Sequence, residues 1–241
     1  MGKRKPQPAY ERVVLKLSGE SMCASGGQGI EPEAVKSIAR EIKLAADTGA
    51  QIAVVIGGGN ICRGPELAAT GLQRTVCDHM GMLATVINAL ALQDALERLG
   101  LEVRVQTAIT MADVAEPYIR RRCIAHLEHG KLCILAAGTG NPFFSTDTAA
   151  VLRAREINAA VLIKATKVDG VYDADPMKNP KAKLFKKLSA REALDRNLRV
   201  MDMTALTMAI EGDLPILVFN LRKCGNIRKA VLGAKIGTLV T

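Results

Sequence analysis

The sequence is poor in aromatic side chains and in histidine, and this scarcity excludes several classes of function. Tryptophan is absent, aromatic residues make up 3% of the 241 residues, and there are three histidines. Proteins that bind single-stranded nucleic acid stack its bases on aromatic side chains, and here those platforms are scarce. The sequence also shows no zinc-finger spacing and no RNA-recognition signature. We therefore expect no nucleic-acid partner.

Paired cysteines and long apolar runs are missing as well. None of the six cysteines forms a C-x-x-C pair, and most lie in apolar runs, which favours free thiols in a reducing compartment. No apolar run has the length that spans a bilayer. The basic N-terminus lacks the apolar core of a secretory signal. We expect a cytoplasmic protein that makes no use of a membrane.

One pattern raises the question of a metal site. Cys123, His126 and His129 are three residues apart, so a helix would place them loosely on one face. A fourth ligand is missing, and the spacing matches no common zinc signature. We interpret the three as surface histidines and a buried thiol, and we predict no metal ligands in this chain.

Positive charge, by contrast, is plentiful. There are 33 lysines and arginines against 24 aspartates and glutamates, which gives a formal net charge of +9. The basic residues form clusters at 3–5, 120–122, 178–187 and 222–229. Such charge attracts anionic ligands, whether small molecules or polymers. It fits a small phosphate-bearing ligand at least as well as a nucleic acid.

Apolar strand-like runs alternate with helix-like segments along the chain. Buried strands are expected at 13–17, 51–56, 102–107, 132–136, 160–164 and 216–220. Helices are expected at 31–48, 75–99, 117–129, 147–157, 189–196 and 202–211. This order is typical of an α/β fold with a mainly parallel sheet covered on both faces, a three-layer αβα sandwich. Residues 1–10 are predicted to form a flexible basic tail, and 11–241 a single domain.

The helix expected at 75–99 is apolar on nearly every side between Met80 and Leu92. A helix that is hydrophobic all round must be buried all round. One face can rest on the sheet, and the other packs most simply against a second subunit, so we predict an oligomer. The alternative is that the C-terminal third of the chain covers it.

Three loops rich in glycine or hydroxyl groups follow strand-like runs, at 16–19, 57–60 and 138–147. Glycine lets the backbone approach a ligand closely, and a loop that leads into a helix can aim N–H groups at an anion. Loops at the carboxyl ends of parallel strands line one crevice. With one lysine and at least one carboxylate, they predict a site for phosphoryl transfer.

The two familiar phosphate motifs do not fit these loops. The dinucleotide fingerprint needs a third glycine that 57–62 does not supply. Gly59 and Gly64 have the separation of a P-loop, but Pro65 and Glu66 stand where lysine and a hydroxyl residue are needed. We therefore predict neither a Walker-type kinase nor a classical dehydrogenase.

Five segments together resemble the bacterial uridylate (UMP) kinases, a family of the amino acid kinase superfamily. They are 16–20, 57–64, 78–85, 138–150 and 164–176, and the similarity runs from about Val13 to the C-terminus. The resemblance implies an amino acid kinase-like fold, with a nucleoside monophosphate-binding part at about 11–160 and an ATP-binding part at about 161–241. It also implies ATP- and Mg²⁺-dependent, in-line phosphorylation of UMP to UDP in pyrimidine nucleotide biosynthesis. A homohexamer, activation by GTP and inhibition by UTP would accompany that activity.

The resemblance further assigns roles to individual residues. Four would be catalytic: Lys16 at the transferred phosphoryl group, Arg63 on a phosphate, Asp147 orienting the lysine or the metal, and Lys164 adding charge. ATP would contact Lys16, Leu17, Ser18, Gly19, Gly59, Arg63, Thr166, Tyr172 and Asp175. UMP would contact Gly58, Asp78, Thr139, Gly140, Asn141, Pro142, Phe143, Phe144, Ser145 and Thr146, with Asp78 on the ribose hydroxyls.

Simpler interpretations of the charged residues stay open at this point. Lys16 can be a strand-end lysine that reaches solvent, and Arg63 can belong to a surface ion pair. Asp78 can complement a helix dipole, and Asp147 can cap a helix. Each would serve the fold without contacting a substrate.

Two other functions compete with UMP phosphorylation. One is phosphorylation of a carboxylate or carbamate such as acetylglutamate, aspartate or glutamate, although 78–85 fits a nucleoside acceptor better. The other is a nucleotide sensor or oxyanion-storage protein, which would be expected to lose at least one of Lys16, Arg63, Asp78 and Asp147. All four are present. The loop at 24–29 aligns with a variable region linked to GTP activation, so the response to GTP stays open.

Overall fold

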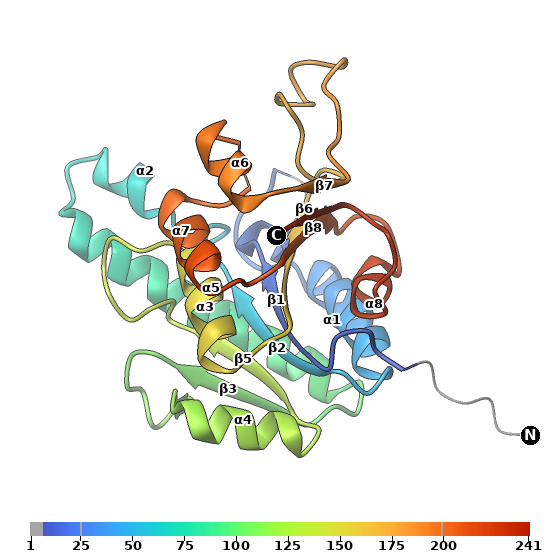
Figure 1. The fold of residues 1–241 in the computed structure, drawn as a ribbon. Coiled ribbons are helices and arrows are strands. Elements are labelled where there is room, and N and C mark those ends of the chain that lie inside the picture. The colour runs from blue at the N-terminus through green and yellow to red at the C-terminus, as the bar shows by residue number, and fades with distance from the viewer. Residues whose placement is uncertain (1–6, 25, 199) are drawn as a thin grey trace, which may run out of the picture.

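In the residues that the structure describes, 7–24, 26–198 and 200–241, nine strands form one sheet through the middle of the molecule (Figure 1). The structure is a computed structural model. The strand order is β4-β3-β5-β2-β1-β6-β8-β9-β7, and neighbours pair in parallel except β8 and β9. The strands are β1 Arg12–Leu17, β2 Gln51–Ile56, β3 Val103–Thr107, β4 Glu116–Pro117, β5 Leu132–Ala136, β6 Val161–Thr166, β7 Lys187–Leu188, β8 Ile216–Asn220 and β9 Thr238–Val240.

Helices cover both faces of this sheet (Figure 1). One face packs against α1 Pro32–Ala46, α3 Arg74–Glu97 and α8 Asn226–Val231. The other packs against α4 Arg120–Glu128, α5 Thr146–Glu156, α6 Ala190–Asp195 and α7 Met203–Glu211. A 3-10 turn, η1 Gly19–Met22, and the short helix α2 Gly64–Ala68 follow β1 and β2. The predicted three-layer α/β fold is confirmed.

Side-chain alternation along the strands creates the two cores. Val13, Leu15 and Leu17 of β1 pack on the α1 side, while Val14 packs on the α5 side. Successive side chains of a strand point to opposite faces, so Lys16 projects with Val14 toward α5. Because both faces are covered, such strands are apolar almost throughout, and that is why the sequence marks them clearly.

The expected strands and helices are all observed, with ends shifted by at most three residues. The prediction missed the short elements β4, β7, β9, α2 and α8. The strands β7 and β9 have two and three residues, and they pair with each other across about fifty residues of chain. Local periodicity is too weak over such lengths to indicate a strand.

The N-terminal boundary differs from the prediction. Residues 1–6 of the predicted tail lie outside the described residues. The N–H of Ala9 donates to the carbonyl of Val231 at 3.0 Å, and Tyr10 packs against the core. The last residues of the predicted tail therefore belong to the folded domain, which begins before residue 11.

Helix α3 is long and apolar enough to cross a membrane by length and composition, contrary to the expectation from apolar runs. It has 24 residues, and the mean hydropathy of its most apolar stretch is 1.3. Of that stretch, 44% is buried within the fold, and Ala89, Leu92 and Leu96 lie in the core between sheet and helices. Helix α3 therefore packs into the core on one side only.

The far side of α3 carries an exposed apolar stripe formed by Val76, Met80, Leu83, Ile87 and Leu90. These side chains are 36–48% exposed, and their spacing of three and four residues places them on one face. The described C-terminal third of the chain leaves the stripe uncovered, so that alternative is wrong. An oligomer stays a prediction.

We expect Gly237→Ala to unfold the protein far more easily than Gly130→Ala. Both glycines have a positive φ, +64° and +74°, so alanine strains the backbone at either position by about 1–2 kcal/mol. A Cβ at Gly237 would also lie 2.0 Å from the carbonyl oxygen of Val218, whereas Gly130 has no atom within 4 Å. Urea unfolding should show an additional loss of about 2 kcal/mol or more for Gly237→Ala. Equal losses would contradict the close approach of the chain before β9 to β8.

Candidate active site

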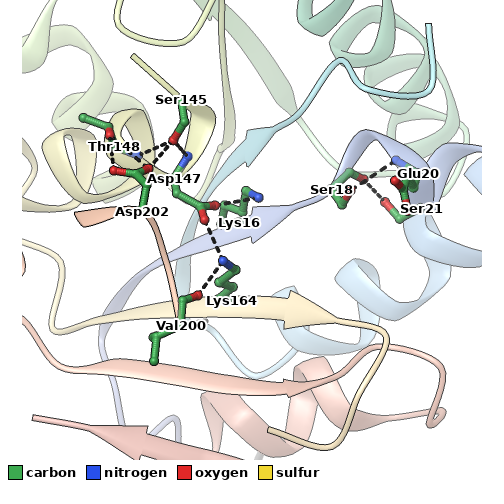
Figure 2. Close-up of polar contacts among 10 residues, drawn as sticks. All are labelled: Lys16, Ser18, Glu20, Ser21, Ser145, Asp147, Thr148, Lys164, Val200 and Asp202. Atoms are coloured by element: carbon green, nitrogen blue, oxygen red, sulfur yellow. Dashed lines mark hydrogen bonds and ion pairs between the residues drawn. The ribbon is translucent and has the colours of Figure 1, made fainter. Parts of the chain in front are cut away.

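Two lysines on neighbouring strands share one carboxylate (Figure 2). Lys16 on β1 and Lys164 on β6 are register partners, and Asp147 is the second residue of α5. Lys16 Nζ lies 2.7 Å from Asp147 Oδ1, and Lys164 Nζ lies 2.6 Å from Asp147 Oδ2. Lys164 also donates to the carbonyl of Val200 at 2.6 Å. Two ammonium groups thus share one carboxylate at the carboxyl ends of β1 and β6, and the charge of Asp202 also acts on Lys164.

Because this charge cluster is largely buried, the pKa values of Asp147 and Lys164 are shifted. The side chains of Lys16, Asp147 and Lys164 are only 11–15% exposed. Burial opposes ionisation of Asp147, but the charges of the two lysines outweigh it, so the pKa of Asp147 lies below its usual value. Burial, together with the charge of Lys16, lowers the pKa of Lys164 although Asp147 acts against it. A lysine with a lowered pKa gains from another anion nearby, so the cluster favours an anionic ligand.

Asp202 fixes the helix end that carries Asp147 (Figure 2). The Ser145 hydroxyl accepts from the N–H groups of Asp147 and Thr148 at 2.9 and 3.2 Å and donates to the Asp202 carboxylate. The Thr148 hydroxyl also donates to Asp202, at 3.0 Å, and the same carboxylate accepts from Ala205 N–H at 2.9 Å. Asp202 thus caps α7 and clamps the start of α5. The sequence marked it only as a helix start, and Ser145, assigned to UMP, uses its hydroxyl to cap α5.

Two cavities flank the cluster. The first, here the β6 cavity, has a volume of about 640 Å³ and is lined by Lys16, Ser18, Lys164, Thr166 and Leu221, among others. The second, here the α3 cavity, has a volume of about 290 Å³ and is lined by Gly58, Gly59, Asp78, Thr139, Asn141 and Thr146, among others. The lysines open to the first cavity, and the start of α5 borders the second. The two cavities could therefore hold two ligands near the cluster.

Arg63 lies in a third cavity, of about 460 Å³, beside the other two. Its guanidinium pairs with Glu20 and with Glu66, the latter at 3.2 Å, and donates to the carbonyl of Gly59 at 3.1 Å. Glu20 also pairs with Lys167. The bond from Lys167 and the charge of Arg63 lower the pKa of Glu20. Arg63 therefore forms surface ion pairs in this structure, which is the simpler of the two interpretations of this residue. It lies at the edge of the predicted site.

Asp78 and the loop at 138–147 form one wall of the α3 cavity. The Asp78 carboxylate accepts from the N–H of Phe143 at 2.8 Å and pairs with Arg74 at 2.8 Å. Gly140 has a φ of +79° and packs against Ala108, which bends the loop over the cavity. Asp78 therefore holds the loop in place besides facing the cavity. The predicted residues Phe143 and Phe144 line the cavity and are largely exposed, whereas Gly140 and Pro142 are outside the lining.

Other predicted ATP residues lie apart from the β6 cavity. Tyr172 forms an isolated antiparallel β-bridge with Leu184, and the carboxylate of Asp175 accepts from the N–H of Met177 at 2.9 Å. Both residues lie in the segment 167–186, which connects β6 to β7 (Figure 1). Leu17 is buried and offers only its backbone, whose carbonyl accepts from Gly57 N–H. Gly19 is buried too. The structure thus brings Ser18 and Thr166 to this cavity, but neither Tyr172 nor Asp175.

Within the described segments, no group of three or more His, Cys, Asp or Glu side chains is placed to hold a metal ion. His126 pairs with Glu116 at 2.9 Å, and His129 contacts the carbonyl of Ala125 at 2.7 Å. Cys123 is buried. Cys123, His126 and His129 therefore lie in three different environments.

A buried lysine-aspartate cluster beside two cavities, at the carboxyl ends of parallel strands, is the arrangement expected of a phosphotransferase. The Amino acid kinase family model matches residues 11–220. This chain belongs to the amino acid kinase family, and the prediction of a kinase is confirmed.

Solved structures that resemble this chain include three kinases of one kind. UMP kinase from Bacillus anthracis is 40% identical with a TM-score of 0.93, over 96% of each chain. UMP kinase from Ureaplasma parvum is 34% identical with a TM-score of 0.90, over 96% of this chain and 98% of that one. Uridylate kinase from Archaeoglobus fulgidus is 28% identical with a TM-score of 0.73, over 95% and 99%. The resemblance to uridylate kinases is confirmed.

We expect Asp147→Asn to lower the free energy of unfolding at pH 7 by about 3 kcal/mol, because it leaves two buried lysines without their shared partner. Asp94→Asn is the matched control, since Asp94 pairs with Arg98 on the surface and its loss should cost under about 1 kcal/mol. Urea unfolding of the three proteins measures both losses. Similar losses in the two variants would contradict a buried, shared carboxylate.

The Asp147 contribution should also depend on pH with a defined sign. The folded-state pKa of Asp147 is lowered, so its stabilisation is complete above the unfolded pKa of about 3.9. It is lost as the pH falls through the lower folded pKa. The difference between the wild type and Asp147→Asn should therefore be constant near neutral pH and shrink below about pH 4. A difference that grows on acidification would contradict the assignment.

Proposed function

We propose that the protein transfers the γ-phosphoryl group of ATP to UMP and releases ADP and UDP. A phosphate oxygen of UMP forms the new P–O bond in line with the bond that breaks to ADP. Relatives named as UMP kinases, 40% and 34% identical over nearly the whole chain, support the substrates. The observation that carries the chemistry is the Lys16–Asp147–Lys164 cluster between two cavities.

The volumes and linings of the cavities support one arrangement of the substrates. ATP is the larger ligand and fits the β6 cavity of about 640 Å³, whose lining belongs to β1, α1, β6 and the segment after β8. UMP fits the α3 cavity of about 290 Å³, where Asp78 can accept from ribose hydroxyls. The resemblance assigns Gly58 to UMP and Gly59 to ATP, but both line the α3 cavity and Gly59 does not line the β6 cavity, so we assign both to the UMP phosphate. Among the described residues, their N–H groups have no acceptor and are available to that phosphate. The α3 cavity is lined entirely within the proposed acceptor part, about 11–160, whereas the β6 cavity combines residues 16–41 with residues 164–224 of the proposed donor part, about 161–241.

In this mechanism the lysines act by charge. Lys16 and Lys164 line the β6 cavity, and their ammonium groups would stabilise the phosphoryl oxygens in the transition state. UMP phosphate is already anionic, so no base needs to remove a proton from it. Asp147, ionised and held between two ammonium groups, serves to fix the lysines. The resemblance gives Asp147 two possible roles, to orient the lysine or to orient the metal. Its contacts with Lys16 and Lys164 favour the first.

Arg63 would change partners when substrates bind. Its guanidinium now contacts Glu20 and Glu66 in a cavity that shares Gly59 with the α3 cavity and Lys167 with the β6 cavity. A phosphate is a stronger acceptor for a planar guanidinium than a half-exposed carboxylate is. The bound phosphates then draw Arg63 and Lys167 away from Glu20.

Mg²⁺ would enter as the complex of ATP. The chain does not fit a cage of its own for the ion near the cavities, because Asp147 is held by two lysines and Glu20 by Arg63 and Lys167. Mg²⁺ binds readily to nucleotide phosphates and keeps several waters. The role of the chain is to receive the phosphates.

The wider setting follows the resemblance. We place the reaction in pyrimidine nucleotide biosynthesis in the cytoplasm, with GTP as an activator and UTP as an inhibitor. UTP carries the same base and ribose as UMP, so it would compete for the α3 cavity.

The first test is ADP release with ATP and Mg²⁺ against UMP, CMP, dUMP, acetylglutamate, aspartate and glutamate. We expect turnover with UMP, and we expect Asp147→Asn to lower kcat at least about 100-fold because the lysines lose their orientation. Asp94→Asn should retain the wild-type rate. Turnover with an amino acid in place of UMP would contradict the proposed substrate, and ATP binding without turnover would favour a sensor.

We further propose that the exposed stripe on α3 is an interface between copies of this chain, in keeping with the implied homohexamer. Leu83→Glu combined with Ile87→Glu should shift the sedimentation coefficient to that of a smaller species, because charge is costly in an apolar contact. Leu44→Glu is the control, since Leu44 is similarly exposed on α1. A wild type that sediments as a monomer, or a double variant that assembles normally, would contradict the proposal.

A further inference from the structure

Two buried asparagines form a closed amide pair beneath the glycine loop that follows β2. Asn60 Nδ2 donates to Asn88 Oδ1 at 3.0 Å, and Asn88 Nδ2 donates to Asn60 Oδ1 at 2.7 Å. Asn60 is 2% exposed and Asn88 is fully buried. Paired amides in a core that are fully satisfied hold one geometry, because any other leaves polar atoms without partners.

Two backbone carbonyls fix the direction of this pair. Asn88 Nδ2 donates its second hydrogen to the carbonyl of Gly57 at 2.7 Å. Asn60 Nδ2 donates its second hydrogen to the carbonyl of Gly29 at 2.7 Å. Turning either amide over would set its oxygen against a carbonyl oxygen, so the orientation is determined. All four amide hydrogens and both oxygens have partners.

The pair joins three segments that are far apart in the sequence. Asn88 belongs to α3, Asn60 ends the loop 57–60, and Gly29 ends the loop before α1 and donates its N–H to Asn60. The loop after β1 packs on the same place, since a Cβ at Gly19 would lie 2.4 Å from Asn60 Oδ1. The contacts hold the loop 57–60 at both ends, at Gly57 and at Asn60.

Between these two anchors lie Gly58 and Gly59, whose N–H groups have no acceptor among the described residues. Both glycines line the α3 cavity. A Cβ at Gly58 would lie 2.7 Å from the carbonyl of Gly81, so α3 supports the loop from behind. An anion cradle made of backbone N–H groups binds well only when the backbone is fixed in advance.

We infer that Asn60 and Asn88 are positioning residues for the acceptor phosphate. The inference rests on the proposed function and deepens it: the pair holds the Gly58 and Gly59 N–H groups toward the phosphate of the nucleotide in the α3 cavity. It contacts neither the base nor the ribose. Its loss should therefore weaken binding of the phosphate and spare binding of the nucleoside.

The test compares UMP with uridine by calorimetry on the full chain. In Asn88→Ala and in Asn60→Ala we expect the Kd for UMP to rise about tenfold, while the Kd for uridine changes less than about twofold. The double variant should be no weaker than the single variants, because the two residues act as one unit. Thr48→Val is the control: it removes a buried hydrogen bond of 2.6 Å, to the carbonyl of Ala45 at the end of α1. It should lower Tm without altering the preference for UMP over uridine.

The outcomes separate the inference from the proposed function. If the wild type binds UMP and the folded asparagine variants keep its preference for UMP over uridine, the inference is wrong and the proposed function stands. If the wild type binds neither compound, the proposed function fails and the inference fails with it. Should Asn88→Ala not fold, Asn88→Leu keeps a similar volume and removes both donated bonds without adding a charge. The same loss of phosphate preference is then expected.

Discussion

Two ammonium groups side by side inside a covered sheet are the constraint on which the site depends. Strand register makes Lys16 and Lys164 neighbours on one face, and burial forbids leaving them without an anion. Asp147 is that anion, so the start of α5 must lie against β1 and β6. Asp202 clamps this helix end and caps α7, so the packing of the C-terminal third is tied to the position of one carboxylate.

Helix α3 has two distinct sides, one that contacts the loops of the site and one that is exposed and apolar. The side that carries Gly81, Thr85 and Asn88 supports the loops of the site: Thr85 accepts from the N–H of Ala137 at 2.7 Å, and Asn88 holds the glycine loop. The other side carries the exposed apolar stripe. One rigid helix thus joins the acceptor loops to a surface suited to a second subunit. The proposed contact between copies of this chain would account for the apolar residues on the exposed side of α3.

Sequence reasoning succeeded where one local pattern determines the structure. The runs 13–17, 51–56 and 132–136 are apolar because both faces of their strands are covered, and all three were predicted. Lys16 stood out as a charge within such a run. Asp202 and Asn88 did not, because their importance comes from partners more than twenty residues away. Asn60 lay inside a noted glycine motif, and the cue that was missed was a polar side chain in the apolar α3 sequence that could reach it. Tyr172 and Asp175 were assigned by resemblance alone. In the structure their contacts lie within the segment 167–186 between β6 and β7.

The wall of the α3 cavity helps to decide which anionic acceptor the site would bind. A carboxylate substrate and a nucleotide phosphate are both anionic nucleophiles, so the Lys16–Asp147–Lys164 cluster alone suits either. Asp78 adds the distinction. Its side chain lines the cavity with 12% exposed; Oδ2 accepts from Arg74 and from the N–H of Phe143, whereas Oδ1 accepts only from Arg74 and can accept a further bond. A carboxylate oxygen with a free lone pair accepts a hydrogen bond from a hydroxyl and offers nothing to a second carboxylate, which has no donor. The cavity therefore favours a ligand that carries hydroxyl donors at one end and an anion at the other, which describes a nucleoside monophosphate better than an amino acid.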